Sequence, residues 1–463
     1  MYPIILLSVS GLITLFLGFS KNKAILLPAT LLFLISAFLI GLLDWNKPGQ
    51  YFDGMLEITN LSIVIQSIIL LSAIFIVALS SKQFDDAYAH PAELFAIVQL
   101  SLVGALMMVT FQNFIMLFLG LEILSVALYV LTGSDKRNLR GNEAAIKYFL
   151  MGAFATGILL FGIAMLYGGT GSFAINGTAA MINLYPEAKI FYWIGMIMIL
   201  VGLLFKVSAA PFHFWTADVY QGAPTIFTAY MATIVKTSGF FALYRIVSIS
   251  FGNDYFIWSN ILMGAIALSL VIGNVSAVFQ SSFKRMLAFS SISQAGFMLL
   301  SVIGLSTMSA SSLGFYSLSY ALATVTAFGV FMVVSANQLE NGRPNENIEV
   351  FNGLYKREPM LAVALVISML SLSGIPLTSG FWGKFFVFND AASKGFIWII
   401  VLAVVMSTVS LYYYFKPIRA TFDESDANLA PIEVPILTKM VLIVCSLLII
   451  LLGIAPQLLK GLI

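Results

Sequence analysis

The sequence FIMLFLGLEILSVALYVLTG, residues 114–133, decides the fold class, because it is apolar throughout apart from Glu122 and three hydroxyl side chains. A helix of about 20 residues, rising about 1.5 Å per residue, is about 30 Å long, which matches the hydrocarbon core of a bilayer. The stretch therefore predicts a transmembrane helix that carries a carboxylate near its middle.

Apolar runs of this kind recur along the whole chain. Of its 463 residues 60% are apolar and only 10% are charged, and the mean hydropathy is +0.99, whereas soluble domains carry about 25% charged residues. So few charges exclude a soluble enzyme and a disordered chain. The net charge of +2 offers no basic surface to DNA or RNA, so we expect a lipid bilayer and no nucleic-acid partner.

We expect an all-α polytopic membrane protein with about 14 transmembrane helices, because helices satisfy their own backbone hydrogen bonds in lipid. The loops between them are too short to fold alone, and the turn-rich segment 44–57 is consistent with a small hairpin. The expected spans are 3–20, 24–43, 58–80, 92–109, 113–133, 143–168, 190–210, 225–246, 257–280, 284–304, 311–337, 359–388, 395–416 and 435–456.

Lysine and arginine are unevenly distributed between alternate loops, and cytoplasmic loops carry the excess. An even number of spans with the N-terminus outside puts thirteen basic residues in inward loops and five at outward ends, so we predict that both termini lie outside. The inward set is Lys21, Lys23, Lys82, Lys136, Arg137, Arg140, Lys284, Arg285, Arg343, Lys356, Arg357, Lys416 and Arg419, and the outward set is Lys47, Lys189, Arg245, Lys394 and Lys460.

Four ionisable residues lie within predicted spans, namely Glu122, Lys206, Lys236 and Lys384. A charge at such depth costs at least about 2.5–3.5 kcal/mol, so partners or a wet cavity are expected. One interpretation is a structural ion pair between Glu122 and one lysine. One carboxylate cannot neutralise three lysines, however, and a desolvated lysine sheds its proton more readily than arginine does. The pattern therefore favours a path for protons or cations.

Two of these lysines lie beside helix-breaking residues: Pro211 follows Lys206, and Gly374 and Pro376 precede Lys384. Proline removes a backbone donor, and the freed groups are tolerated at membrane depth only where they face protein or water. These are the seventh and twelfth spans, which cross in opposite directions, so we predict two inverted five-helix repeats, each with a broken helix. The predicted domains are N-terminal helices 1–3 at 1–91, the first repeat at 92–246, the second at 257–416 and a last helix at 435–463.

The sequence lacks the motifs of redox and nucleotide chemistry, since it has one cysteine, two histidines, no P-loop and no GxGxxG. We therefore expect no redox centre and no metal site on this chain. His213 is a candidate proton relay, because imidazole titrates near pH 6.5, or else a hydrogen-bonded structural residue. Together with Asp218 it forms the one reactive pair that would suit a polytopic membrane enzyme such as a lipid transferase.

Four stretches resemble the subunit N family of the bacterial proton-pumping NADH–quinone oxidoreductase, respiratory complex I. They are FLGLE at 118–122, EAAIKYF at 143–149, PFHFWTADVYQGAPT at 211–225 and KRMLAFSSI at 284–292. The string DVYQGAP is the most specific of them, and the resemblance covers roughly residues 90–415.

The resemblance implies an antiporter-like membrane-arm subunit in a bacterial inner membrane. It implies that Glu122 and Lys206 form a coupling pair, that Lys236 is the central relay and that Lys384 faces the exit half-channel. A charge change in the neighbouring subunit would weaken the pair and send the proton on to Lys236, Lys384 and the outside. NADH, FMN, iron–sulfur clusters and quinone would lie on partner subunits, and the chain would contact a neighbouring antiporter-like subunit and small membrane subunits.

The chain departs from the family at Gln294, where many relatives have His, at Phe297, where they have Tyr, and at Ala217, which replaces a frequent proline. No titrating side chain therefore stands at Gln294, although it can still order water. Two other functions stay open. A subunit of a multisubunit cation/proton antiporter shares most of this layout, and a non-conducting membrane scaffold predicts no connected polar groups.

Overall fold

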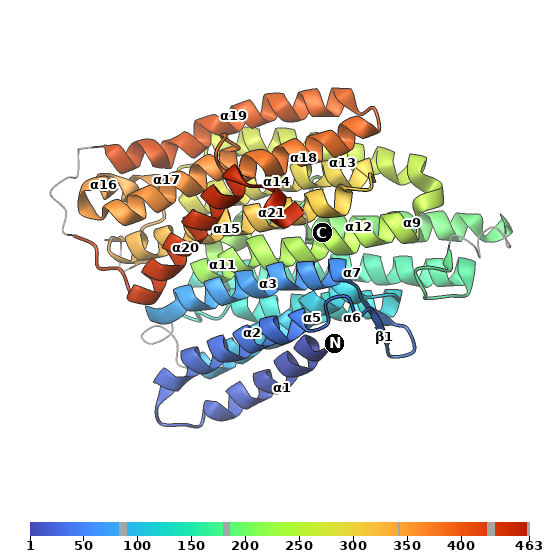
Figure 1. The fold of residues 1–463 in the computed structure, drawn as a ribbon, viewed down its shortest axis with the longest axis horizontal. Helices are drawn as coiled ribbons and strands as arrows, with labels where there is room; N and C mark the ends of the chain where they lie inside the picture. The colour runs from blue at the N-terminus through green and yellow to red at the C-terminus, as the bar shows by residue number, and fades with distance from the viewer. Residues whose placement is uncertain (83–89, 179–185, 341–342, 424–430, 461–463) are drawn as a thin grey trace.

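The computed structural model describes residues 1–82, 90–178, 186–340, 343–423 and 431–460. Within this part, 12 helices are long and apolar enough to cross a membrane, and Tyr2–Leu17 and Pro359–Ser373 are shorter apolar helices. Figure 1 shows the long helices lying alongside one another in one bundle. The predicted all-α polytopic architecture is confirmed.

The longer described helices fall at the predicted spans, whereas the short helices Phe214–Gly222, Leu354–Arg357 and Gln457–Lys460 lie outside them. The N-terminal ones are α1 (Tyr2–Leu17), α2 (Leu26–Leu42) and α3 (Asn60–Leu79). Next come α5 (Pro91–Thr110), α6 (Phe114–Thr132), α7 (Leu139–Thr170), α9 (Lys189–Lys206), α10 (Phe214–Gly222), α11 (Thr225–Tyr230), a π-helical segment (Met231–Val235) and α12 (Lys236–Ile249). The remainder are α13 (Tyr255–Val278), α14 (Phe283–Gly304), α15 (Ser309–Ala336), α16 (Leu354–Arg357), α17 (Pro359–Ser373), α18 (Ser379–Ser393), α19 (Ile397–Phe422), α20 (Ile436–Ile454) and α21 (Gln457–Lys460).

Local sequence signals explain where several helices begin and where the chain turns. The Asn113 side chain caps α6 by accepting a hydrogen bond from the backbone of Ile115, and Ser282 caps α14 in the same way. Strands β1 (Gly49–Tyr51) and β2 (Leu56–Ile58) pair antiparallel, which confirms the hairpin predicted in 44–57. A second hairpin pairs β3 (Leu339–Glu340) with β4 (Arg343–Pro344).

The two predicted repeats pack in matching ways. In the first, α5 packs against α6, α7 against α9, and α5 contacts α12; in the second, α13 packs against α14, α15 against α17, and α13 contacts α19. The short helix after each break also packs against the third helix of its own half, α10 on α7 and α18 on α15. This correspondence supports two five-helix repeats, whose boundaries stay a prediction.

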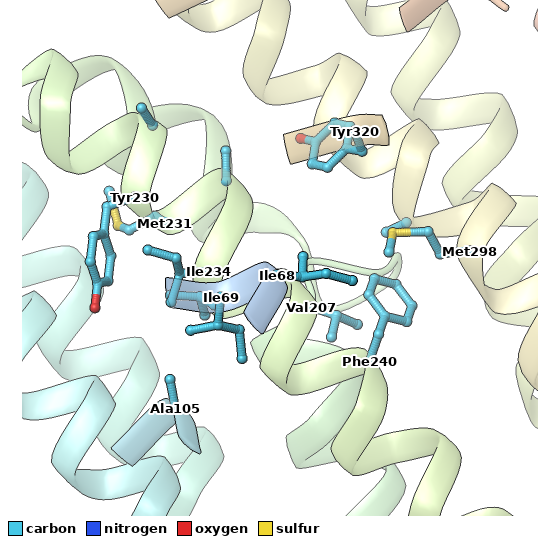
Figure 2. Packing of buried hydrophobic residues seen from close by; sticks show 14 of the residues in the cluster. Ile68, Ile69, Ala105, Val207, Tyr230, Met231, Ile234, Phe240, Met298 and Tyr320 are labelled. Carbon is cyan, nitrogen blue, oxygen red and sulfur yellow. The ribbon is translucent and has the colours of Figure 1, made fainter. Parts of the chain in front are cut away.

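Apolar side chains from both halves fill the interior of the bundle. Figure 2 shows Ile68 and Ile69 of α3, Phe240 of α12 and Met298 of α14 gathered around the segment that precedes and begins α12. The helical stretch Thr225–Ile249 is surrounded by protein along its whole apolar window. A charge on this stretch is therefore shielded from lipid and from bulk water alike.

Candidate functional site

The first helix break lies where the sequence predicted it. α9 ends at Lys206, and Ser208 adopts a left-handed φ of 62°. The backbone N–H of Ala210 donates to Ser269 Oγ at 2.8 Å, and the Trp215 indole donates to the carbonyl of Phe205 at 3.1 Å. These backbone groups are freed by the break and find protein partners, as membrane depth requires.

Lys206 is held by a hydroxyl rather than by the expected carboxylate. Its side chain is 4% exposed, and its ammonium donates to Ser125 Oγ at 2.7 Å. Glu122, one helical turn from Ser125, interacts electrostatically with Lys206, but no ion pair within 4.0 Å joins them in the described residues. Glu122 Oε1 is buried without a hydrogen-bond partner. The static ion pair considered as an alternative is therefore not the arrangement that these residues adopt.

Lys236 lies at the meeting point of the two halves. It is 1% exposed and directly follows the π-helical segment Met231–Val235, a wide turn of the type that often occurs at functional sites. Its ammonium donates to the carbonyl of Ser291 on α14 and lies 5.8 Å from the centroid of the Tyr320 ring on α15. The first repeat thus contributes the amine, and the second repeat contributes its neighbours.

The step from Lys206 to Lys236 crosses an apolar contact. α9 and α12 meet at Gly239, where an added Cβ would lie 2.8 Å from Val207 Cγ1 and 3.8 Å from Lys206 Cγ. Figure 2 places Val207 and Phe240 in the same apolar region. No hydrogen bond joins the two lysines in the described part of the chain, since Lys206 donates to Ser125 and Lys236 to Ser291.

The second break supplies a hydrogen-bond acceptor for Lys384. α17 ends at Ser373, and Gly374 follows with a left-handed φ of 85°. The ammonium of Lys384, whose side chain is 5% exposed, donates to the freed carbonyl of Ser373 at 2.7 Å and to Ser407 Oγ at 2.9 Å. It also lies 4.7 Å from the centroid of the Phe297 ring.

A small cavity lies beside Lys384 and is lined on another side by Tyr320. Its volume is about 10 Å³, close to the about 10–15 Å³ that one water molecule needs. Tyr320 is shared, since it also faces Lys236. The lining residues are Gln294, Tyr316, Ser319, Tyr320, Ser371, Leu372, Gly380, Gly383 and Lys384.

Gln294 is the centre of the hydrogen bonds around this cavity. Its Oε1 accepts a hydrogen bond from the Tyr316 hydroxyl, and its Nε2 donates to the carbonyl of Leu372 and to the Tyr414 hydroxyl, both at 3.0 Å. The residue that sequence comparison singled out as a non-titrating departure thus fixes the polar groups between two buried lysines. Connected polar groups of this kind do not fit a non-conducting scaffold.

His213 and Asp218 do not form a reactive pair. The His213 ring is 7% exposed and packs on Phe214, and its Nδ1 has no hydrogen-bond partner. Burial lowers the pKa of this imidazole, which keeps it neutral at pH 7. Asp218 instead pairs with Lys147 and Arg285, both at 2.8 Å. The reactive pair on which the membrane-enzyme alternative depended is therefore not formed by these two residues.

Two buried charges escaped the sequence prediction. Lys284, counted with the inward loops, lies in the first turn of α14, where it is 4% exposed and donates to the carbonyls of Gln221 and Ala223 at 2.7 and 2.6 Å. Asp390 on α18 is 1% exposed, so Glu122 is not the only carboxylate inside the bundle. The sequence signal for Asp390 was its position six residues after Lys384 within one helix.

We predict that Asp218→Asn weakens the junction between the halves, because Lys147 belongs to α7 and Arg285 to α14. Burial raises the pKa of Asp218, but these two cations outweigh it and hold the pKa below its usual value. The stabilisation is therefore complete above the unfolded pKa near 3.9 and is lost as the pH falls through the lower folded value. Each exposed pair contributes less than about 1 kcal/mol.

Thermal unfolding of the purified complex measures this effect. The variant should unfold at a temperature a little below the unsubstituted protein at pH 5–8, and the two should converge toward pH 3. The exposed Glu187→Gln serves as the control and should unfold normally throughout. Equal unfolding temperatures for Asp218→Asn and the unsubstituted protein at pH 7 would contradict the role of Asp218.

Comparisons with known proteins agree with this arrangement. Residues 112–410 match the family described as NADH:quinone oxidoreductase/Mrp antiporter, transmembrane. A Flavobacterium psychrophilum protein named NADH-quinone oxidoreductase subunit N is 37% identical over 99% of both chains, and one of the same name from Cytophaga hutchinsonii is 39% identical over 99% of this chain and 98% of its own. A chain in the structure of respiratory complex I from Thermus thermophilus with bound aureothin is 34% identical, with a TM-score of 0.85 over 99% of this chain and 98% of that chain.

Proposed function

The chain belongs to the NADH:quinone oxidoreductase/Mrp antiporter family of membrane proteins, and from that premise we propose that it translocates protons as a membrane-arm subunit of an NADH–quinone oxidoreductase. Relatives that match over their full length carry the name of this oxidoreductase subunit, which favours it over a separate cation/proton antiporter. NADH, FMN, iron–sulfur clusters and quinone then belong to partner subunits.

The observation that carries the proposal is the state of the three buried amines. Lys206, Lys236 and Lys384 donate to neutral oxygens: hydroxyls of Ser125 and Ser407 and carbonyls of Ser291 and Ser373. In the described residues none of the three has an acidic partner within 4.0 Å. An amine held by neutral acceptors in an apolar interior exists with or without its proton, whereas a tight carboxylate partner would hold the proton in place.

The path runs from Lys206 to Lys236 across the apolar contact at Gly239, and then past Tyr320 and the Gln294 cavity to Lys384. Water molecules complete the apolar step, and the polar groups around Gln294 order the next one. Each amine receives a proton from the one before and passes it on to the next.

The electrostatic interaction between Glu122 and Lys206 limits how much of the energy for proton transfer this pair can supply alone. Two unit charges about 4 Å apart in an effective dielectric of about 20 interact by about 4 kcal/mol, and Glu122 and Lys206 are farther apart than 4.0 Å. Moving one proton against about 200 mV costs about 4.6 kcal/mol. The redox reaction of the partner subunits therefore has to act on the path at more than one point.

The surroundings of Glu122 suit a neighbouring subunit. Leu119, Ile123 and Val126 on the same helix are 43, 37 and 53% exposed, and Glu122 itself is half-buried beside them. A charge on an antiporter-like neighbour that covers this side of α6 would act on Glu122 at short range. Small membrane subunits of the complex are the other expected contacts.

The distribution of basic residues supports an orientation in a bacterial inner membrane with both termini outside. In this orientation α14 runs outward from Lys284, and Lys384 on α18 lies on the outer side of the second break. His213 would lie near the inner side, where its neutral imidazole and its unpartnered Nδ1 suit a relay that delivers protons to Lys206.

We predict that Lys206→Ala and Glu122→Ala each lower proton pumping in the complete complex reconstituted into vesicles. Lys206→Ala removes a proton carrier, and Glu122→Ala removes the charge that biases it. Pumping is measured as acidification per NADH oxidised with a quinone acceptor. NADH oxidation by an artificial acceptor, measured in the same preparations, reports on assembly of the peripheral part.

Normal pumping in both variants would defeat the assignment. The experiment also includes a sodium-free arm, because an antiporter subunit would show flux that depends on sodium, whereas a proton pathway should work equally well without it.

A further inference from the structure

Asp390 of α18 is a carboxylate that the lysine path does not use. Its side chain is 1% exposed, and its oxygens accept hydrogen bonds from Ser301 Oγ at 2.5 Å and from Ser306 Oγ at 2.7 Å. Among the described residues no cationic group lies within 4.0 Å of it. A buried carboxylate that only hydroxyls hold is costly while it stays charged.

Asp390 lies where the next proton acceptor after Lys384 is expected. The two are six residues apart on α18, which corresponds to about 9 Å along a helix. On α14, Phe297 contacts Lys384 and Ser301 contacts Asp390, and these two residues are one helical turn apart. In the proposed orientation Asp390 lies between Lys384 and the outer surface.

The serine cluster around Asp390 accommodates both protonation states. Ser301 has one hydroxyl proton but two acceptors in range, Asp390 Oδ2 at 2.5 Å and the carbonyl of Ser309 at 3.0 Å. While Asp390 is ionised, Ser301 donates to Oδ2. Once Asp390 is protonated, the acid donates to Ser301 Oγ, and the Ser301 hydroxyl turns to Ser309. Neither state leaves a side-chain donor of this pair unsatisfied.

Other titratable groups lie around this cluster. Tyr244 on α12 interacts electrostatically with Asp390. The exposed Lys394, one turn further along the chain, lies 5.5 Å from the centroid of the Tyr255 ring, whose hydroxyl donates to the carbonyl of Ile303. Lys394, the cation nearest to Asp390 in sequence, is thus directed to an aromatic ring rather than to the carboxylate.

We propose that Asp390 is the last proton-carrying group of the outward half-channel. In the first step an N–H bond of the Lys384 ammonium breaks and an O–H bond forms on Asp390 through intervening water, which leaves a neutral amine and a neutral acid. In the second step that O–H bond breaks, the proton leaves for the outer water, and Asp390 returns to the carboxylate. The inference rests on the proposed function, and no oxidant or reductant takes part in either step.

The test compares Asp390→Asn, Asp390→Glu, Lys384→Ala and the control Asp254→Asn in the reconstituted complex. Asp254 suits the control because it is another acceptor carboxylate, bound to the Trp193 indole at 3.1 Å. Asp390→Asn keeps the size of the side chain and an acceptor for Ser306 but cannot carry a proton. We expect Asp390→Asn to lose as much of the pumping per NADH as Lys384→Ala loses. Asp390→Glu should retain at least half of the pumping that Asp390→Asn loses, and Asp254→Asn should pump normally.

Normal pumping by Asp390→Asn while Lys384→Ala pumps poorly would overturn this inference and leave the proposed function standing. Normal pumping by both would overturn the proposed function itself. If Asp390→Asn does not assemble, Ser301→Ala takes its place, since it keeps the carboxylate and removes the hydroxyl that serves both protonation states. Unchanged pumping in Ser301→Ala would then refute the inference.

Discussion

Lys236→Met should abolish the whole contribution of this chain to proton pumping, which is a larger effect than we expect for Lys206→Ala or Glu122→Ala. Lys236 is the amine through which the first half meets the second, since it donates to Ser291 and faces Tyr320. Methionine has a similar length and adapts to irregular apolar packing. The substitution therefore removes the proton carrier while the bundle keeps its shape.

The measurement is acidification per NADH oxidised in vesicles that contain the complete complex. Lys189→Met is the matched control, because that lysine is exposed at the start of α9 and lies over the Trp193 ring at 5.0 Å. We expect the control to pump normally. Full pumping by Lys236→Met would show that protons cross by another route.

Gly380→Val should prevent the second half from forming properly. Gly380 lies in the first turn of α18, where its N–H donates to Ser371 Oγ at 3.2 Å. A Cβ at this position would overlap with the carbonyl oxygen of Ser371, so the two sides of the break could not approach. Overpacking costs about 1–3 kcal/mol in ordinary cores, and an overlap with rigid backbone should exceed that range.

The amount of the chain recovered in the membrane complex, and its unfolding temperature, measure the effect. Gly157→Val is the control, since an added Cβ at Gly157 on α7 meets nothing within 4 Å. We expect the control to assemble fully. Normal assembly of Gly380→Val would mean that the approach of α18 to Ser371 is not essential.

The sequence predicted those parts of the fold that depend on local signals. Apolar length located the fourteen helical regions, Pro211 and Pro376 located the two breaks, and the turn-rich composition of segment 44–57 indicated the hairpin. Each of these follows from how a short stretch of chain interacts with lipid or with its own backbone. They are therefore independent of which distant segments become neighbours.

The parts that sequence reasoning missed depend on distant neighbours. Lys206 lies near both Ser125 and Glu122, and only side-chain geometry decides that the Ser125 hydroxyl accepts the hydrogen bond of the ammonium. Lys284 is buried because the carbonyls of Gln221 and Ala223 turn toward it. Asp390 followed an apolar run near a predicted span end, and nothing in that run indicated that Ser301 and Ser306 would enclose it.

The wide turn at Met231–Val235 has a consequence for the length of this helix. In an ordinary helix the loss of one residue swings everything beyond it by about 100°, which would aim Lys236 away from Ser291. A π-helical turn contains an extra residue, so one residue can be removed there while the side chains of the flanking segments keep their orientation. Homologues that are one residue shorter within this turn can therefore keep the Lys236 amine directed at the carbonyl of Ser291. A one-residue gap at this point of an alignment does not imply that the lysine has lost its role.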